Sequence, residues 1–72
     1  MVVGAGARMD PSAKVEDWAV VGPGAVVEAG AVVRRSVLWD GARVKAGVRV
    51  EDSVLTEGAV ADRDVVNEVI LA

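Results

Sequence analysis

The sequence predicts an all-β protein, a parallel β-helix of about four coils, and two observations indicate it. Residues 21–37 are repeated directly as residues 38–54, with 8 of 17 aligned positions identical. Within each copy an aliphatic residue recurs about every six positions, and a Gly or Ser followed by a small residue recurs with it. A fixed internal period of this kind is typical of stacked repeats. Gly would cost about 1 kcal/mol each inside a helix, so short strands joined by turns are the consistent alternative.

Each six-residue unit is expected to form one short strand and one corner. Two units, beginning at Val33 and Val50, have five residues, and both are the third of a triplet. Three units therefore make one coil, with one corner a residue tighter than the others. The units begin at Val3, Met9, Val15, Val21, Val27, Val33, Leu38, Val44, Val50 and Leu55.

Stacking of such coils as parallel strands places residues 17 or 18 apart above one another, about 4.8 Å apart. The fourth residue, which is Gly or Ser in every unit except the one that begins at Val15, is expected to take the left-handed backbone of the corner, and the small residue after it to fill the inside. Three inward columns are predicted: Val3, Val21, Leu38 and Leu55; Met9, Val27, Val44 and Ala61; and Val15, Val33 and Val50.

Charged residues follow the same stacking. Residues 16–17 are acidic, 34–35 basic and 51–52 acidic, so one face is expected to alternate in charge from coil to coil. Glu28, Lys45 and Asp62 alternate in the same way on the second face. Opposite charges across neighbouring strands contribute about 0.2–1 kcal/mol each. A solvated surface with mixed charges explains the pattern equally well.

The two ends differ from the middle. Residues 1–20 follow the period loosely, with Met9 in an aliphatic slot and Pro11 and Trp18 at turns. Residues 61–72 lose the corner Gly, and restarting the period at Val66 places Ile70 inward and Leu71 at the start of an unfinished coil. A bare coil end offers unpaired backbone and apolar surface, so both ends are candidate contact surfaces.

Composition narrows the functional classes. The chain has 72 residues and is treated as one domain, 1–72, with net charge −3 and acidic and basic residues interspersed, which argues against a nucleic-acid surface. It has no Cys, which suits a reducing cytoplasm, and no apolar run near the roughly 20 residues of a membrane span. It also has no His, which removes the usual base near neutral pH and the usual metal ligand.

No catalytic, cofactor-binding or metal site is assigned. The remaining carboxylates are spaced by the repeat and are interpreted as solvated surface; they are Asp40, Glu57, Asp62 and Asp64. The stretch 4–14 is rich in Gly and contains Arg8, Pro11 and Lys14, like a phosphate-binding loop. Such a loop needs a helix after it. Gly4 and Gly6 instead fall in the six-residue register, so a structural role is expected.

Two tryptophans are the only aromatic residues. Trp39 follows the inward Leu38 and is expected to face outward, and Trp18 is expected at an outward corner. An exposed Trp in a chain with so few aromatics indicates a partner surface, although each ring could also lie flat on its own coil. The candidate interface residues are Trp39, Trp18, Ile70 and Leu71.

The units at residues 21–26, 27–32 and 44–49 resemble hexapeptide-repeat proteins, and the resemblance implies a left-handed parallel β-helix. Residues 35–42 and 51–55, which include the shortened units, resemble the C-terminal domain of sugar-1-phosphate nucleotidyltransferases. The closest group is mannose-1-phosphate guanylyltransferase and glucose-1-phosphate thymidylyl- or adenylyltransferase. In that group the catalytic domain is a separate N-terminal one, and the β-helix serves oligomerisation and sometimes regulation.

The resemblance implies a non-catalytic assembly domain, a C-terminal fragment that lacks its catalytic domain and forms a homo-oligomer in the cytoplasm. The parent enzyme would use Mg and a nucleoside triphosphate for nucleotide-sugar synthesis, and the fragment itself would need no cofactor. Two alternatives stay open: a hexapeptide-repeat acyltransferase-like domain that contributes to a site, and a stand-alone β-helix scaffold. The absence of His argues against acyltransferase and carbonic anhydrase activity of the chain alone.

Overall fold

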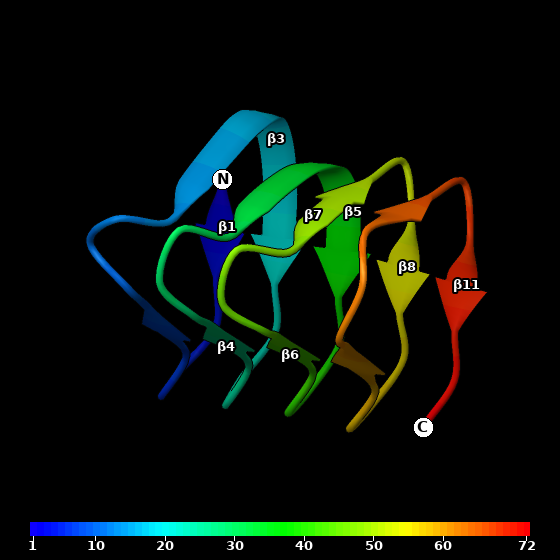
Figure 1. Cartoon of the computed structure of the whole chain (residues 1–72). Helices are drawn as coiled ribbons and strands as arrows, with labels where there is room; N and C mark the ends of the chain where they lie inside the picture. The colour runs from blue at the N-terminus through cyan, green and yellow to red at the C-terminus, as the bar shows by residue number, and fades with distance from the viewer.

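A computed structural model describes residues 1–72 as a stack of short parallel strands without any helix. Figure 1 shows the coils following one another from the N-terminus to the C-terminus. The strands are β1 (Val2–Val3), β2 (Arg8–Met9), β3 (Lys14–Val21), β4 (Val26–Val27), β5 (Val32–Leu38), β6 (Arg43–Val44), β7 (Arg49–Glu51), β8 (Val54–Leu55), β9 (Val60–Ala61), β10 (Val65–Val66) and β11 (Val69–Ile70). The predicted all-β solenoid of about four turns is confirmed.

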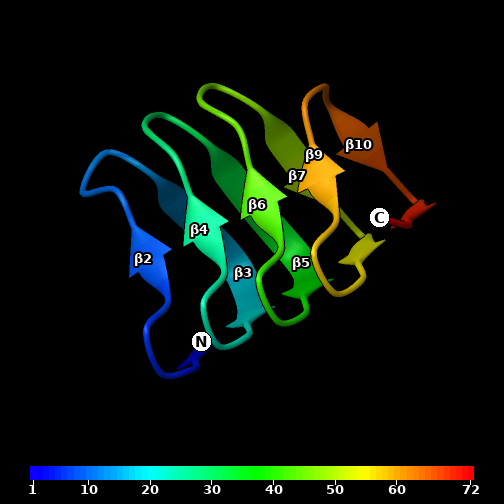
Figure 2. The same cartoon turned by 90° about the horizontal axis from the view of Figure 1, so that it is seen from below.

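The strands form two parallel sheets. One consists of β2, β4, β6 and β9, which lie side by side in Figure 2. The other runs β1-β3-β5-β7-β10, with β8 paired to β5 and β11 paired to β8. Because β3 and β5 continue around a corner without a break, this second sheet covers two sides of the coil. Strand pairing is therefore always between one coil and the next.

The register confirms the three predicted inward columns, and burial confirms them except at Val3, which pairs with Val21 but is 50% exposed. Val27 pairs with Val44 in the second column, Val33 with Val50 in the third and Val21 with Leu38 in the first. The largest fully buried side chains are Leu38, Leu55, Val21, Val27, Val33, Val44, Val50 and Val65. Burial of each Val or Leu stabilises the fold by about 1.5–3 kcal/mol, so these columns are the main source of stability.

The corners at the fourth-position glycines are as predicted, whereas Ser12, the fourth residue of the unit that begins at Met9, does not have left-handed backbone. Gly24, Gly30 and Gly47 have φ near +70°, and the Ala or Val that follows each is buried. Only Gly takes this backbone without a steric cost, which explains its period in the sequence. The structure thus explains both parts of the repeated pattern, the Gly at the corner and the small residue that follows it.

The tight third corner differs from the prediction. The residues with left-handed backbone there are Arg35 (φ 45°) and Asp52 (φ 50°), whereas Ser36 and Ser53 are buried. The shorter unit moves the corner one residue earlier, so Ser takes the inner small position. Its hydroxyl then replaces a strand hydrogen bond: Ser36 Oγ donates to the Arg34 carbonyl (2.8 Å) and accepts from the Ser53 N–H (3.1 Å).

The first coil lacks this shortening. Between Glu16 and Ala19 the register with β5 shifts, because the first coil contains one residue more than the second coil at this corner, and Trp18 is the extra residue. An extra residue of this kind forms a β-bulge and turns a side chain out of the ladder. Trp18 accordingly lies at an outward corner, 46% exposed, as predicted.

The last coil corrects a second prediction. The period restarts at Val65, which pairs with Val50 and is buried, and not at Val66, which is 52% exposed. The connection from Ala61 to Val65 is two residues shorter than that from Val44 to Val50. Ile70 pairs with Leu55 and packs partly against the core, as expected, and Leu71 is exposed.

The stretch 4–14 has a structural role. It belongs to the first coil, with Gly6 at a left-handed turn (φ 71°) and strand β2 after it instead of a helix. A Cβ on Gly4 would lie 2.4 Å from the Pro23 nitrogen, so Gly4 is required by close packing of the next coil. No helix of the chain is long and apolar enough to cross a membrane.

Candidate interaction groove at the tight corner

Four residues with left-handed backbone form a column along the tight corner, one from each coil. They are Asp17 (φ 63°), Arg35, Asp52 and Asn67 (φ 54°). Non-Gly residues rarely adopt this conformation, and Asp and Asn do so more readily than most. Because each one sits where the chain turns, its side chain points outward, and successive coils bring the four side chains together.

Arg35 joins three of these coils. Its Nε and NH2 donate to the two carboxylate oxygens of Asp52, at 2.6 and 2.9 Å, and its NH1 donates to Asp17 at 2.8 Å. The hydrogen bond from Arg35 lowers the pKa of Asp17 and that of Asp52, and the two carboxylates raise the pKa of the guanidinium. Bidentate guanidinium–carboxylate pairs are the strongest and most directional of such contacts.

Arg34 and Arg49 extend the alternation along the third side. Arg34 lies 3.3 Å from Asp17 and 3.9 Å from Glu51, and Arg49 lies 2.8 Å from Glu16 and 2.7 Å from Glu51. The predicted alternation of charge between residues 16–17, 34–35 and 51–52 is confirmed as a network of ion pairs.

The second face is different from the prediction. Glu28 pairs with Arg43 (2.7 Å) and accepts a hydrogen bond from the Ala46 N–H, and no ion pair joins it to Lys45. Arg43 lies in the coil after that of Glu28, at the outward position next to the inward Val44. Its side chain reaches back to the Glu28 carboxylate. The hydrogen bond from Arg43 lowers the pKa of Glu28.

An unbroken column of valines lies on the outer surface beside the tight corner. The register places Val2 next to Val20, Val20 next to Val37, and so on through Val54 to Val69. The three middle valines are half-buried, and Val2 and Val69 are each 63% exposed. The corresponding columns of the other two sides contain Arg or Lys, so only this side presents a continuous apolar stripe. We call it the valine stripe.

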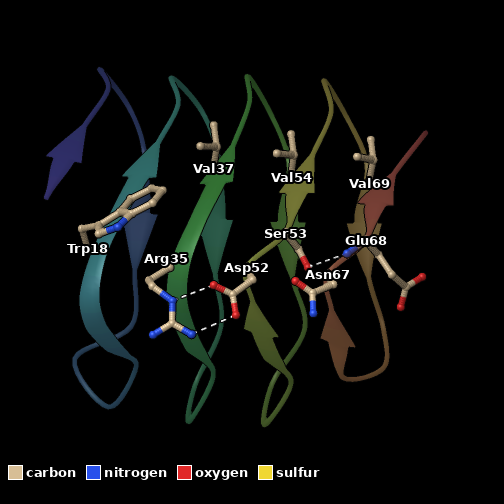
Figure 3. Close-up of a pocket in the computed structure, with 9 residues that line it drawn as sticks. All are labelled: Trp18, Arg35, Val37, Asp52, Ser53, Val54, Asn67, Glu68 and Val69. Carbon is tan, nitrogen blue, oxygen red and sulfur yellow. Dashed lines mark hydrogen bonds and ion pairs between the residues drawn. The ribbon is translucent and has the colours of Figure 1, made fainter.

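The tight corner and the valine stripe together border a shallow groove of about 440 Å³. Trp18 stands at the first-coil end, and the second, third and fourth coils form the floor and the rim (Figure 3). The first coil has an extra corner residue, Trp18, and the next coil has no residue in the corresponding position. This absence leaves the groove beside Trp18. The lining residues are Trp18, Arg35, Val37, Asp52, Ser53, Val54, Asn67, Glu68 and Val69.

Most polar groups of the rim already have partners within the chain. Ser53 Oγ donates to the Glu51 carbonyl (2.6 Å) and accepts from the Glu68 N–H (3.1 Å). The Glu68 carboxylate pairs with Arg63 at 3.0 Å, and the hydrogen bond from Arg63 lowers the pKa of Glu68. No buried polar side-chain atom lacks a partner. The groove therefore offers apolar surface with a neutralised rim, and no unpaired charge to hold an ionic ligand.

The predicted candidate residues are not all in one place. Trp18 is in the groove, whereas Trp39 (51% exposed) lies on the other side of the valine stripe, between Gly22 of the coil before and Thr56 of the coil after. Ile70 and Leu71 lie at the end of the last coil. The candidate interface is thus a surface spread over one side and one end.

The carboxylates considered for chemistry do not converge. Asp40, Glu57, Asp62 and Asp64 are all exposed, and no group of three carboxylates could hold a metal ion. Asp64 instead accepts a hydrogen bond from the backbone N–H of Arg49 at 2.9 Å. This bond joins the short connection between Ala61 and Val65 to the coil before it.

The sequence prediction did not identify the groove. The signal was present in the valine that precedes each inward residue of the first column, which is Val in every coil. The alternation of inward and outward side chains along a strand would have placed these valines outside.

These features define a β-solenoid built from hexapeptide repeats, with an exposed apolar side. The sequence model described as GlmU-like, C-terminal hexapeptide, matches residues 2–72, and the chain belongs to this family. No curated protein and no solved structure shows a significant match.

Proposed function

We propose that the chain is a non-catalytic assembly domain of a GlmU-type nucleotidyltransferase, an enzyme of nucleotide-sugar synthesis, and that it joins subunits into a homo-oligomer in the cytoplasm. The valine stripe is the observation that carries this proposal. It is flanked by Trp18 and Trp39, which are 46% and 51% exposed. Contiguous exposed apolar surface with aromatic residues is characteristic of protein–protein interfaces.

The family match supports the proposal that the parent protein is a GlmU-type enzyme. A GlmU-like, C-terminal hexapeptide domain is by its description one part of a larger enzyme. Under this proposal the catalytic domain is separate, and it would use Mg and a nucleoside triphosphate. The solenoid then supplies a rigid side on which subunits meet.

A role in acyl transfer is the second candidate, since hexapeptide-repeat acyltransferases share the repeat. Acyl transfer needs a general base poised near neutral pH, most often His. The chain has no His, and its exposed carboxylates are dispersed. A base would have to come from another domain or subunit, so assembly is the function that the residues of this chain favour.

Sedimentation velocity of the 72-residue chain between 1 and 100 µM tests the assembly function. We expect a species heavier than the 7.4 kDa chain, in increasing amount with concentration. A strict monomer over this whole range would overturn the proposal. Independently, the gene should carry an upstream reading frame for a nucleotide-binding domain, and a gene without one would overturn the proposed parent enzyme.

A further inference from the structure

The groove at the tight corner combines one aromatic side chain with a polar rim. Trp18 borders it at the first coil, and Asn67 and Glu68 border it at the fourth (Figure 3). Four of its nine lining residues are hydrophobic, Trp18 and three valines of the valine stripe, and the others are polar. The groove is therefore amphipathic, and an occupant has to satisfy both kinds of surface.

The rim keeps hydrogen-bonding capacity although its charges are paired. Each carboxylate oxygen of Asp52 accepts one hydrogen bond from Arg35. Each carboxylate oxygen of Glu68 accepts one from Arg63. A carboxylate has about four acceptor sites, so each of these two retains about two. The exposed Asn67 amide makes no hydrogen bond within the chain, and it offers donors as well as an acceptor.

Two classes of ligand do not match this groove. An ionic ligand would need a free opposite charge, but the Arg35 guanidinium is already shared between Asp17 and Asp52. A purely apolar ligand would cover the Asn67 amide without giving it a partner, and covering an unpaired polar group costs free energy. A neutral ligand that has both apolar surface and hydroxyl groups meets neither difficulty.

A saccharide is a ligand of this kind. A pyranose ring carries C–H groups on its faces and hydroxyl groups around its edge. The weakly positive C–H groups stack on the negative face of an indole, and the hydroxyl groups pair with amide and carboxylate groups. The Trp18 side chain is 46% exposed and borders the groove, so it is available for such stacking.

The length of the groove selects more than one sugar ring. Trp18 and Asn67 lie three coils apart, which is about 14 Å at about 4.8 Å for each strand spacing. One pyranose ring is shorter than this distance. The coils follow one another in a straight row in Figure 3, so the groove between them is straight. A β-1,4-linked disaccharide, which is extended and flat, follows such a groove better than the bent α-1,4-linked form.

We propose that the groove binds a neutral, extended disaccharide, with one ring stacked on Trp18 and the hydroxyl groups of the other bonded to Asn67 and Glu68. This inference goes beyond the proposed assembly function and does not depend on it. Because the floor of the groove is part of the valine stripe, a second subunit and the disaccharide would compete for the same surface. Binding is therefore measured at low chain concentration.

Tryptophan fluorescence tests the proposal, with cellobiose as the β-1,4-linked probe. Trp39→Phe leaves Trp18 as the only tryptophan, so the emission reports on the groove alone. At 1 µM chain we expect a saturable shift to shorter wavelength, with a dissociation constant on the order of 1 mM, because a shallow groove covers only one face of the ligand. Maltose, the α-1,4-linked isomer, should bind roughly threefold more weakly or worse. Glucose 1-phosphate, a single ring with a charge, should give no saturable shift.

Substitution of Asn67 locates the ligand. Asn67→Gly removes the amide and keeps the left-handed backbone (φ 54°), which Gly adopts freely. In the Trp39→Phe background it should weaken cellobiose binding roughly fivefold or more, because a hydrogen-bond partner is lost. Glu57→Gln is the matched control, since Glu57 is an exposed polar residue outside the groove, and it should leave the constant within about twofold. Circular dichroism confirms that each variant is folded.

The outcomes separate this inference from the assembly function. An emission spectrum that cellobiose leaves unchanged up to roughly ten times the expected constant overturns the proposal, whether the chain is monomeric or associated, since the groove is then unsuited or covered. Maltose or glucose 1-phosphate binding as tightly as cellobiose also overturns it. So does an unchanged constant after Asn67→Gly, which would place the sugar elsewhere. Sedimentation velocity without sugar decides the assembly function by itself.

Discussion

Arg35 Nε lies 2.6 Å from a carboxylate oxygen of Asp52, a residue 17 positions further along the chain. The pair spans one complete coil, and the same guanidinium reaches Asp17 in the coil before. Arg35 therefore links three of the coils at the corner where the backbone of each is left-handed. Since side chains at this corner cannot slide without breaking these bonds, the contacts fix the stacking register.

We expect Arg35→Gln to lower the melting temperature more than Arg8→Gln. Arg8 is an exposed residue of the first coil that makes no ion pair, so its replacement controls for the loss of one surface charge. The difference between the two variants should shrink from 0.15 M to 1 M salt, because salt screens exposed charges. Equal melting temperatures at both salt concentrations would show that the ion pairs do not contribute to stability.

Acid should destabilise the protein through the same carboxylates. Hydrogen bonds from Arg35 hold the pKa of Asp17 and of Asp52 below the ordinary 3.8, and Arg43 holds that of Glu28 below 4.5. A carboxyl whose pKa is lower in the folded state contributes stability that is fully present above its unfolded pKa and is lost as pH falls through the folded value.

Thermal melts should therefore give a constant melting temperature from pH 7 to about pH 5.5 and a fall below about pH 4.5. Asp52→Asn should make this fall smaller, because one of the shifted carboxyls is gone. A melting temperature that rises on acidification, or a fall of the same size in the variant, would contradict the assignment.

The Ser36 hydroxyl is expected to stabilise the tight corner. Ser36→Ala removes the acceptor of the Ser53 N–H, a buried group, and an unpaired buried donor costs about 1–3 kcal/mol. Ser12→Ala is the matched control, since its hydroxyl accepts the exposed N–H of Gly30, which water can reach. Urea denaturation should show a loss of stability for Ser36→Ala and a clearly smaller one for Ser12→Ala. Equal losses would mean that burial of the hydroxyl is unimportant.

Val44→Asp is expected to unfold the protein. Val44 is fully buried in the second column between Val27 and Ala61, and an unpaired charge there has no partner. Val60→Asp provides the control, because Val60 is 44% exposed and points outward from the next coil. Circular dichroism should show loss of the β spectrum for Val44→Asp alone. A folded Val44→Asp variant with an unchanged melting temperature would refute the inward column.

The sequence was sufficient to predict the coils and columns because each depends on local chemistry. Gly at residues 24, 30 and 47 marks corners that only Gly takes freely, and the aliphatic period marks the inner side. The tight corner was assigned one residue late, because Ser36 fits a corner as well as an inner position. Only the stacking of coils, which puts the hydroxyl against the Ser53 N–H, decides between the two.

The groove could not be predicted from the sequence of any single repeat unit. It results from a difference between coils: Trp18 has no counterpart in the second coil, and the missing residue leaves a hollow beside the valine stripe. The partner of Glu28 was missed for a similar reason. Alternation of charge predicts Lys45, but the reach of Arg43 across the strand decides the contact.

The account depends most on the claim that residues one coil apart share a column, and solution NMR with methyl-labelled valine and alanine tests it most directly. Nuclear Overhauser contacts are expected between the methyl groups of Val27 and Val44, and between those of Val44 and Ala61, because these residues are register partners. Absence of both contacts in a folded sample, with Val44 instead in contact with the methyl groups of Val48, as in a helix, would contradict the solenoid.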